Sequence, residues 1–271
     1  MPKKVKKDPT LPIVLPIIED EADKELNDSL HPNLPKAPSV LCVYASFRSG
    51  KTVLVNNFIL NPNFLRGKLD QIYYYSPTIR NDPSGKYLID EPGVQIVDEY
   101  SEDHLNALLD FQMESKSIGE ADKISIIFDD AIQYLQSRKS SGNHLATKFR
   151  HYNIKYLFYV SQSFRALDTK VRANCKGVII MKISNLKELQ KIDEEYGGLL
   201  GGRFFDLYNY CLNDQPYSFM YINIDANPVQ AFLRFERQIF PSPEFQPSAK
   251  YAHMFSNVED SNVEEKTEEK I

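Results

Sequence analysis

Short apolar runs rich in β-branched residues alternate with amphipathic stretches along most of the chain. The run at 124–128 is apolar at all but one position, which is typical of a strand buried on both faces of a sheet. The pattern predicts strands at 40–45, 69–75, 94–97, 124–128, 154–160 and 177–181. It predicts helices at 51–60, 102–113, 144–152, 186–196 and 203–212.

The last two predicted strands, at 218–224 and 229–235, flank the turn sequence Asp225-Ala226-Asn227-Pro228. Two extended runs separated by such a turn indicate a hairpin that closes the domain. The preceding alternation of strands and helices predicts an α/β fold, with a mainly parallel central sheet and helices on both faces.

Both ends of the chain differ in composition from this central part. Residues 1–37 combine several prolines with mixed charge, so we expect a proline-rich, partly basic, flexible arm. Residues 241–271 begin with prolines and continue into an acidic stretch, so we expect a disordered acidic tail. This leaves one folded domain at 38–240.

Charge and cysteine content exclude several classes of protein. The chain has a net charge of −5, so any contact with nucleic acid must be local rather than spread over the whole surface. Its three cysteines lie far apart, which argues against a disulfide framework or a zinc site and favours an intracellular location. No apolar stretch is long enough for a membrane span or a signal peptide, so we expect no contact with a membrane.

An eight-residue segment between the first predicted strand and helix carries the strongest chemical signal. Such a loop exposes unpaired backbone N–H groups at a helix N-terminus and therefore binds anions. Lys51 is expected to reach the β- and γ-phosphates of ATP, and the Thr52 hydroxyl to contact Mg²⁺. The predicted nucleotide-binding residues are Ala45, Ser46, Phe47, Arg48, Ser49, Gly50, Lys51 and Thr52.

Polar side chains at two later strand ends complete the expected site. Asp129 and Asp130 follow an apolar strand, and carboxylates at that end of a central strand face the crevice that holds the phosphates. Asp129 is expected to hold Mg²⁺, and Asp130 to orient or deprotonate the attacking water. Gln162, at the end of the next strand, is expected to sense the γ-phosphate or position the water.

Three basic residues are candidates for contacts outside this pocket. Arg150 ends a predicted helix and is expected to act as an arginine finger on a neighbouring subunit's phosphates. The alternative is a solvated cation at a helix C-terminus. Arg138 and Lys139, in the sequence QSRKSSGN, are the preferred candidates for contact with DNA phosphates.

Taken in this order, the motifs resemble the FtsK–HerA class of P-loop ATPases. Within that class the sequence is most similar to the poxvirus-type genome-packaging ATPases of large eukaryotic DNA viruses and their smaller relatives. The resemblance covers residues 38–235 and is most specific over 124–162, where acid pair, basic helix and Gln162 strand follow in family order. The chain departs from the family at Ala45, where Gly is usual, and at Asp130, where cellular members carry Glu.

The resemblance implies a RecA-like P-loop NTPase fold of the additional-strand type. It implies a homo-oligomeric ring that hydrolyses ATP with Mg²⁺ and moves double-stranded DNA, most specifically into a viral capsid. A capsid component is then an expected partner. The expected location is the host cytoplasm, in a viral factory, or the virion.

Other functions remain open on the sequence. A helicase-like ring ATPase shares the same class, although the chain shows no second RecA-like half. A P-loop nucleotide kinase would need lid cations, which Arg138, Arg165 and Arg172 could supply. A non-enzymatic nucleotide-binding scaffold has only the Ala45 departure in its favour. The acid pair followed by a sensor-like Gln162 suits attack by water better than transfer to an acceptor.

Overall fold

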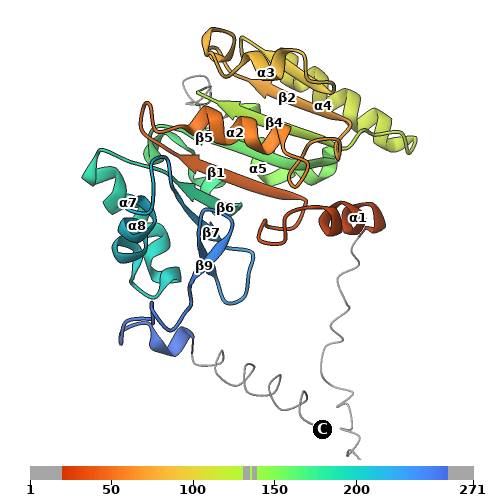
Figure 1. Cartoon of the computed structure of the whole chain (residues 1–271). Coiled ribbons are helices and arrows are strands. Elements are labelled where there is room, and N and C mark those ends of the chain that lie inside the picture. Colours follow the sequence, from red (N-terminus) through yellow and green to blue (C-terminus); the bar gives the residue numbers. More distant parts are fainter. Residues whose placement is uncertain (1–19, 131–134, 136–138, 256–271) are drawn as a thin grey trace, which may run out of the picture.

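The structure is a computed structural model that describes residues 20–130, 135 and 139–255. It is built on one nine-stranded sheet with the spatial order β3-β2-β4-β5-β1-β6-β7-β8-β9 (Figure 1). The strands are β1 (Ser39–Tyr44), β2 (Gln71–Tyr75), β3 (Val94–Val97), β4 (Ile124–Asp129), β5 (Ile154–Ser161), β6 (Cys175–Ile180), β7 (Met220–Asn223), β8 (Gln230–Leu233) and β9 (Arg237–Phe240).

The sheet is parallel from β3 to β6 and antiparallel from β6 to β9. Strand β5 pairs with β1 on one side and with β4 on the other, so it separates the phosphate-loop strand from the acid-pair strand. This is the additional-strand arrangement that the resemblance implied. The antiparallel pair β7–β8 is the hairpin predicted around Asn227.

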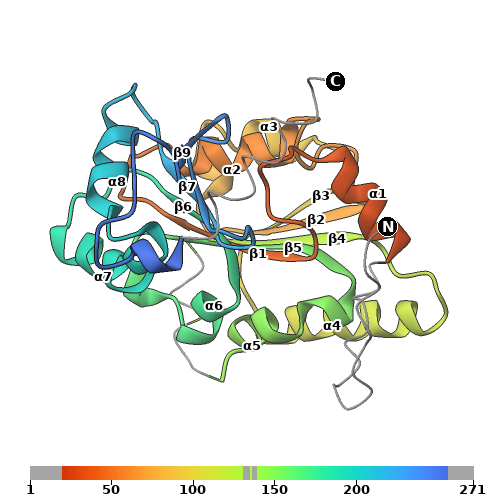
Figure 2. The same cartoon turned by 90° about the horizontal axis from the view of Figure 1, so that it is seen from below.

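Helices cover both faces of the sheet, as Figure 2 shows from below. On β1, Leu41 and Val43 face a core shared with α1 to α3, whereas Val40, Cys42 and Tyr44 face a core shared with α4 to α8. The helices are α1 (Glu21–Ser29), α2 (Lys51–Leu60), α3 (Lys86–Ile89), α4 (Glu102–Ser117), α5 (Ser141–Lys148), α6 (Thr169–Ala173), α7 (Leu186–Tyr196) and α8 (Phe204–Leu212). This two-faced burial explains the near-continuous apolar runs of the parallel strands.

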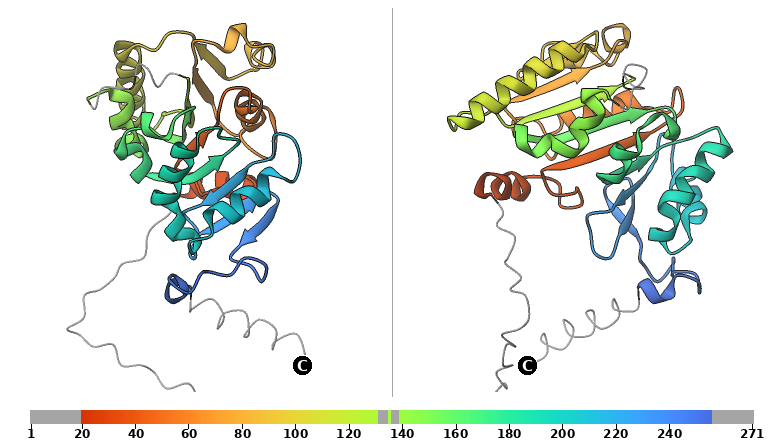
Figure 3. Two further views of the ribbon diagram at one scale, coloured as in Figure 1. Left: turned by 90° about the vertical axis from the view of Figure 1, so that its left-hand side faces the viewer. Right: turned by 180° about the vertical axis from the view of Figure 1, so that it is seen from behind.

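The expectation of an extended arm up to residue 37 was wrong for residues 20–37. Helix α1 begins after the N-cap Asp20 and lies beside the domain (Figure 3). Leu26, Leu30 and Leu34 are buried. Asp23 forms an ion pair with the buried Lys155 at the start of β5. The proline content of the segment led us to predict no packed element there. The three leucines recur at four-residue spacing and pack on the face of the sheet that α2 also covers.

The expectation of a disordered tail was also wrong for residues 241–255, which follow β9 back onto the domain. The ring of Phe245 packs edge-on against Tyr210 of α8 at 5.3 Å, and Phe255 packs against Phe240 at 5.2 Å. The Ser248 amide donates to the Gly201 carbonyl at 2.9 Å. Prolines here shape a packed turn instead of preventing packing. Residues 1–19 and 256–271 lie outside the described residues.

Within the described ranges, no helix has the length and apolar character that crossing a membrane requires.

Candidate nucleotide site

The segment 45–50 connects β1 to α2 and is held at both neighbouring strand ends. The Ala45 amide donates to the Ser161 carbonyl at 3.0 Å, and the Ser46 amide donates to the Lys182 carbonyl at 3.0 Å. The Ser184 amide donates to the Ser46 hydroxyl at 2.9 Å. The loop is therefore anchored to the last residue of β5 and to the chain that follows β6, and these bonds hold its shape.

Gly50 and Ala45 show how the loop accommodates an alanine where the usual pattern has glycine. Gly50 has φ +91°, a left-handed conformation that favours glycine, and directly precedes the first residue of α2. Ala45 is fully buried and does not adopt positive φ, so its methyl group fits where the usual pattern has glycine. The Ala45 departure is therefore compatible with a phosphate-binding loop.

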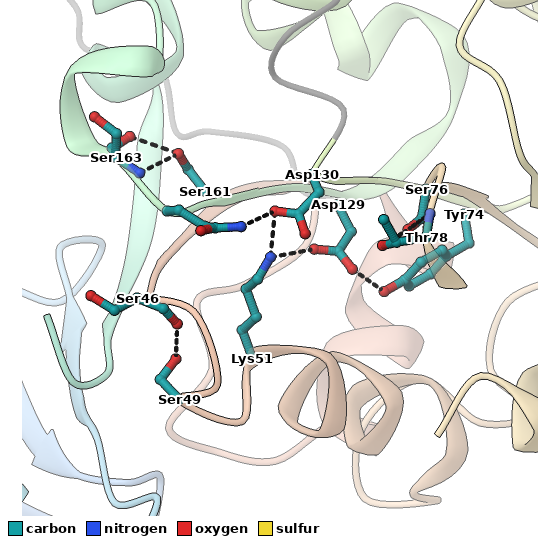
Figure 4. Close-up of polar contacts among 11 residues, drawn as sticks. Ser46, Ser49, Lys51, Tyr74, Ser76, Thr78, Asp129, Asp130, Ser161 and Ser163 are labelled. Carbon is teal, nitrogen blue, oxygen red and sulfur yellow. Dashed lines mark hydrogen bonds and ion pairs between the residues drawn. The ribbon is translucent and has the colours of Figure 1, made fainter. Parts of the chain in front are cut away.

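Lys51, the first residue of α2, points to the end of β4 (Figure 4). Its ammonium pairs with Asp130 Oδ1 and lies 3.6 Å from Asp129 Oδ1. Lys51 and Asp129 are both buried, with only 7% and 1% of their surfaces exposed. The fold thus brings the predicted phosphate-binding cation and both predicted carboxylates into one cluster, although they are 79 residues apart in the chain.

Asp129 is the deepest member of this cluster. Its Oδ2 accepts a 2.7 Å hydrogen bond from the Tyr74 hydroxyl, whereas its buried Oδ1 has no hydrogen-bond partner. Burial raises the pKa of Asp129 above its usual value, and the nearby Lys51 ammonium partly opposes that rise. An acceptor oxygen buried without a donor is a suitable ligand for a hard cation or for its bound water.

These residues fit Mg²⁺ only if the nucleotide shares in holding it. No cluster of three or more His, Cys, Asp or Glu that could bind a metal occurs among the residues that the structure describes. Mg²⁺ is usually bound by one or two carboxylates together with substrate phosphates and water. Asp129, with the half-buried Thr52 on the first turn of α2, would provide the protein share of that set.

Gln162 extends the cluster from β5. Its amide nitrogen donates to Asp130 Oδ1 at 3.2 Å, and both side chains are accessible at the carboxyl edge of the sheet. Asp130 itself has φ +52°, an uncommon backbone conformation for an aspartate that often marks functional sites. The predicted water-positioning residues therefore meet at one carboxylate oxygen.

Arg150 does not lie at this site in its own chain. It is an exposed residue in the short helix Phe149–Tyr152, which precedes β5. Because β5 ends beside the phosphate loop, Arg150 lies toward the opposite edge of the sheet. Its carbonyl accepts a 3.1 Å hydrogen bond from the Lys116 ammonium. Arg150 is therefore too far away to reach the nucleotide of its own subunit, and its contact with a neighbouring subunit stays a prediction.

The structure describes one of the two candidate residues for DNA contact. Lys139 is exposed just before α5, and Arg138 lies outside the described residues.

Arg172, one of the cations that a kinase lid would need, donates to Glu195 at 3.1 Å and to the Leu167 carbonyl at 2.8 Å. This anchoring makes Arg172 a structural residue and weakens the kinase alternative.

Two residues of the site were missed by sequence reasoning. Tyr74 carries the hydrogen bond to Asp129, but it lies in the predicted strand 69–75, where sequence reasoning assigned it no role in the site. Tyr217 lies against Gly50 and comes from a turn far along the chain that no local pattern connects to the loop. Only the alternation of side chains along β2 could have distinguished Tyr74, because it places Tyr74 on the opposite face of the sheet from Tyr73 and Tyr75.

The strand order, the anchored loop and the acid pair define the fold of a P-loop ATPase. No protein-family model and no curated protein matches the sequence. Solved structures do share the fold. One is B204, the DNA-packaging ATPase from Sulfolobus turreted icosahedral virus, with 15% identity, a TM-score of 0.54, and coverage of 72% of this chain and 97% of that chain.

A second is the genome-packaging NTPase B204 from Sulfolobus turreted icosahedral virus 2, in complex with ATP-gammaS. It has 14% identity and a TM-score of 0.52, and the match covers 73% of this chain and 98% of that chain. At such identities the comparison establishes the fold, and that fold is the one the sequence resemblance implied.

Proposed function

We propose that this protein is an ATP-hydrolysing DNA translocase, and specifically a viral genome-packaging ATPase that drives double-stranded DNA into a capsid. The observation that carries the proposal is the cluster in which Lys51 meets Asp129 and Asp130, with Gln162 bonded to Asp130. The fold shared with a DNA-packaging ATPase supports the choice of DNA as the moved substrate.

The chemistry follows from the side chains of the cluster. When ATP enters, Lys51 exchanges a carboxylate for the β- and γ-phosphates, which frees Asp130. Asp130 and Gln162 then orient a water toward the γ-phosphate, and Asp130 accepts its proton. Thr52 and Asp129 would hold Mg²⁺, which would supply charge neutralisation at the phosphate oxygens.

Movement of DNA requires more than one subunit. We propose a head-to-tail ring, in which the exposed Arg150 of one subunit meets the nucleotide of the next. Arg138 and Lys139 would contact DNA phosphates without reading sequence. A capsid component is the proposed partner, and the host cytoplasm or the virion the proposed location.

DNA-stimulated ATP hydrolysis, measured together with particle mass in solution, tests the proposal. We expect a particle larger than one chain and hydrolysis that rises when double-stranded DNA is added. The stimulation should weaken as salt is raised, because phosphate contacts release counterions. Stimulation by single-stranded DNA alone would favour the helicase-like ring. Hydrolysis by a monomer that ignores DNA would refute the translocase.

A further inference from the structure

An exposed aromatic side chain lies directly on the phosphate loop. Tyr217 has 71% of its surface exposed, yet its ring touches Gly50. A Cβ atom added at Gly50 would lie 3.1 Å from Tyr217 Cδ1 and 3.6 Å from Cγ. One part of the ring therefore packs on the loop backbone, and the rest is open to solvent.

The backbone holds Tyr217 in an unfavourable conformation. Its φ is +64°, which is a genuine outlier for a bulky side chain. The turn around it is fixed, because the Ser218 amide donates to the Gln215 carbonyl at 3.1 Å and the Arg234 amide donates to the Phe219 carbonyl at 3.0 Å. Packing does not explain this strain, since the side chain is mostly outside the core. Strained residues of this kind concentrate at ligand sites.

Tyr217 approaches the loop from the flank opposite the acid pair. Asp130 follows β4, and Gln162 follows β5, whereas Tyr217 precedes β7, whose first residue Met220 pairs with Ile180 at the end of β6. Strand β1 lies between β5 and β6, so the loop separates the two groups. In Figure 4 Lys51 likewise extends to Asp129 and Asp130, away from Ser46 and Ser49.

This arrangement fixes the direction of a bound nucleotide. Its terminal phosphate lies where Lys51, Asp130 and Gln162 converge, and its remaining phosphates follow the loop. The nucleoside end must then leave the loop on the β6–β7 flank, where Tyr217 presents an open aromatic face. Met181, whose Cε is 3.6 Å from the same Gly50 position, is buried beneath the loop on this flank.

We propose that Tyr217 is the base-stacking residue of the nucleotide site, and that it binds purine nucleoside triphosphates through the face of its ring. The proposal rests on the proposed ATP site and adds to it the residue that holds the nucleoside. Stacking recognises any flat base and favours the larger purines, so Tyr217 contributes affinity without reading the edge of the base.

The test compares the binding of Mg·ATP with that of magnesium tripolyphosphate, which has no base. Full-length wild type, Tyr217→Ala and Tyr217→Phe are titrated by calorimetry, with Phe111→Ala as the control. Phe111 is an aromatic residue of similar exposure, 60%, on α4. Helix α4 covers the face of the sheet opposite to the one that α2 covers. Tyr217→Ala should weaken ATP binding about tenfold and leave tripolyphosphate binding unchanged. Tyr217→Phe and Phe111→Ala should bind both ligands as wild type does.

Equal weakening of both ligands by Tyr217→Ala would overturn the proposal, because it would show that the ring only supports the loop. Unchanged binding of both would overturn it too, and would assign the exposed ring to another contact. Tripolyphosphate binding also reports that the variant is folded. Wild-type protein that binds neither ligand would refute the proposed ATP site, whereas normal ATP binding by Tyr217→Ala would refute only the role of Tyr217.

Discussion

The ammonium of Lys51 forms an ion pair with the carboxylate of Asp130, so the expected phosphate-binding cation and the expected water-activating base are direct partners in the fold. A single ammonium cannot serve both a triphosphate and this carboxylate fully. In the proposed mechanism, ATP binding would therefore release Asp130 from Lys51 when a substrate phosphate arrives.

Replacing Lys51 by Ala should abolish ATP binding, because the cation that compensates the phosphate charge is lost. The change also removes the charge that opposes the raised pKa of Asp129, so that carboxyl should become protonated more readily. ATP titration with Lys148→Ala as the control checks this, since Lys148 is an exposed lysine at the end of α5. Normal ATP hydrolysis by folded Lys51→Ala would remove the site assignment.

Asp130→Asn should bind Mg·ATP but hydrolyse it on the order of a hundredfold more slowly, as expected for the loss of a general base. Asp129→Asn should instead weaken Mg²⁺ binding and raise the Mg²⁺ concentration that activity requires, because the amide is a poorer ligand than the carboxylate. Nucleotide binding and single-turnover hydrolysis, measured across a Mg²⁺ series, separate the two effects. The division of roles fails if both variants show the same defect.

Tyr74→Phe should move the acidic limb of the pH profile of kcat/KM to higher pH. Asp129 must be ionised to hold Mg²⁺, so activity falls as the pH drops through its pKa, which burial already raises above the usual value. The Tyr74 hydroxyl stabilises the ionised form, and its removal raises that pKa further. Tyr73→Phe is the matched control on the same strand. An unshifted limb in Tyr74→Phe would mean that Asp129 does not set it.

Mixing Arg150→Ala subunits with Lys51→Ala subunits should restore part of the activity that each lacks alone. In a head-to-tail ring some interfaces would then pair an intact loop with an intact Arg150. A trans arginine finger contributes roughly a thousandfold in rate, so a minority of such interfaces is measurable. His151→Ala, a change in the adjacent exposed residue, should be active by itself. Full activity of Arg150→Ala would return this residue to the role of a helix-end surface cation.

Asp23→Ala should destabilise the domain by about 3 kcal/mol, because it leaves Lys155 buried and unpaired. The double variant Asp23→Ala with Lys155→Met should recover much of that loss, since no charge then remains without a partner. Urea denaturation measures both, and the exposed pair Lys191–Glu194 is the control. Equal stability of Asp23→Ala and wild type would show that the Asp23–Lys155 ion pair does not stabilise the domain.

Sequence reasoning succeeded where neighbouring residues carry the information. The apolar run of β1, the loop after it and the start of α2 at Lys51 were all predicted, because strand, anion site and helix N-terminus are local features. The position of β5 between β1 and β4 came from a family resemblance, since spatial strand order is not written in any local pattern.

What the sequence could not show depends on contacts between distant segments. Tyr74 and Tyr217 acquire their importance only when β2 and the turn before β7 arrive at the site. Helix α1 was missed because nearby prolines dominated the composition, whereas the structure buries its Leu26 and pairs its Asp23 with Lys155. Tertiary packing outweighed local propensity in that segment.

Strand β5 connects the two residues assigned to neighbouring nucleotides: Arg150 precedes it and Gln162 follows it. Its eight residues span about 26 Å and are bonded on both sides, so the strand can neither stretch nor slide without breaking its ladders. A displacement of Gln162 during hydrolysis would therefore shift Arg150 as well. In a ring, this mechanical link would make adjacent subunits hydrolyse ATP in turn. One inactive subunit would then also lower the hydrolysis rate of its neighbours.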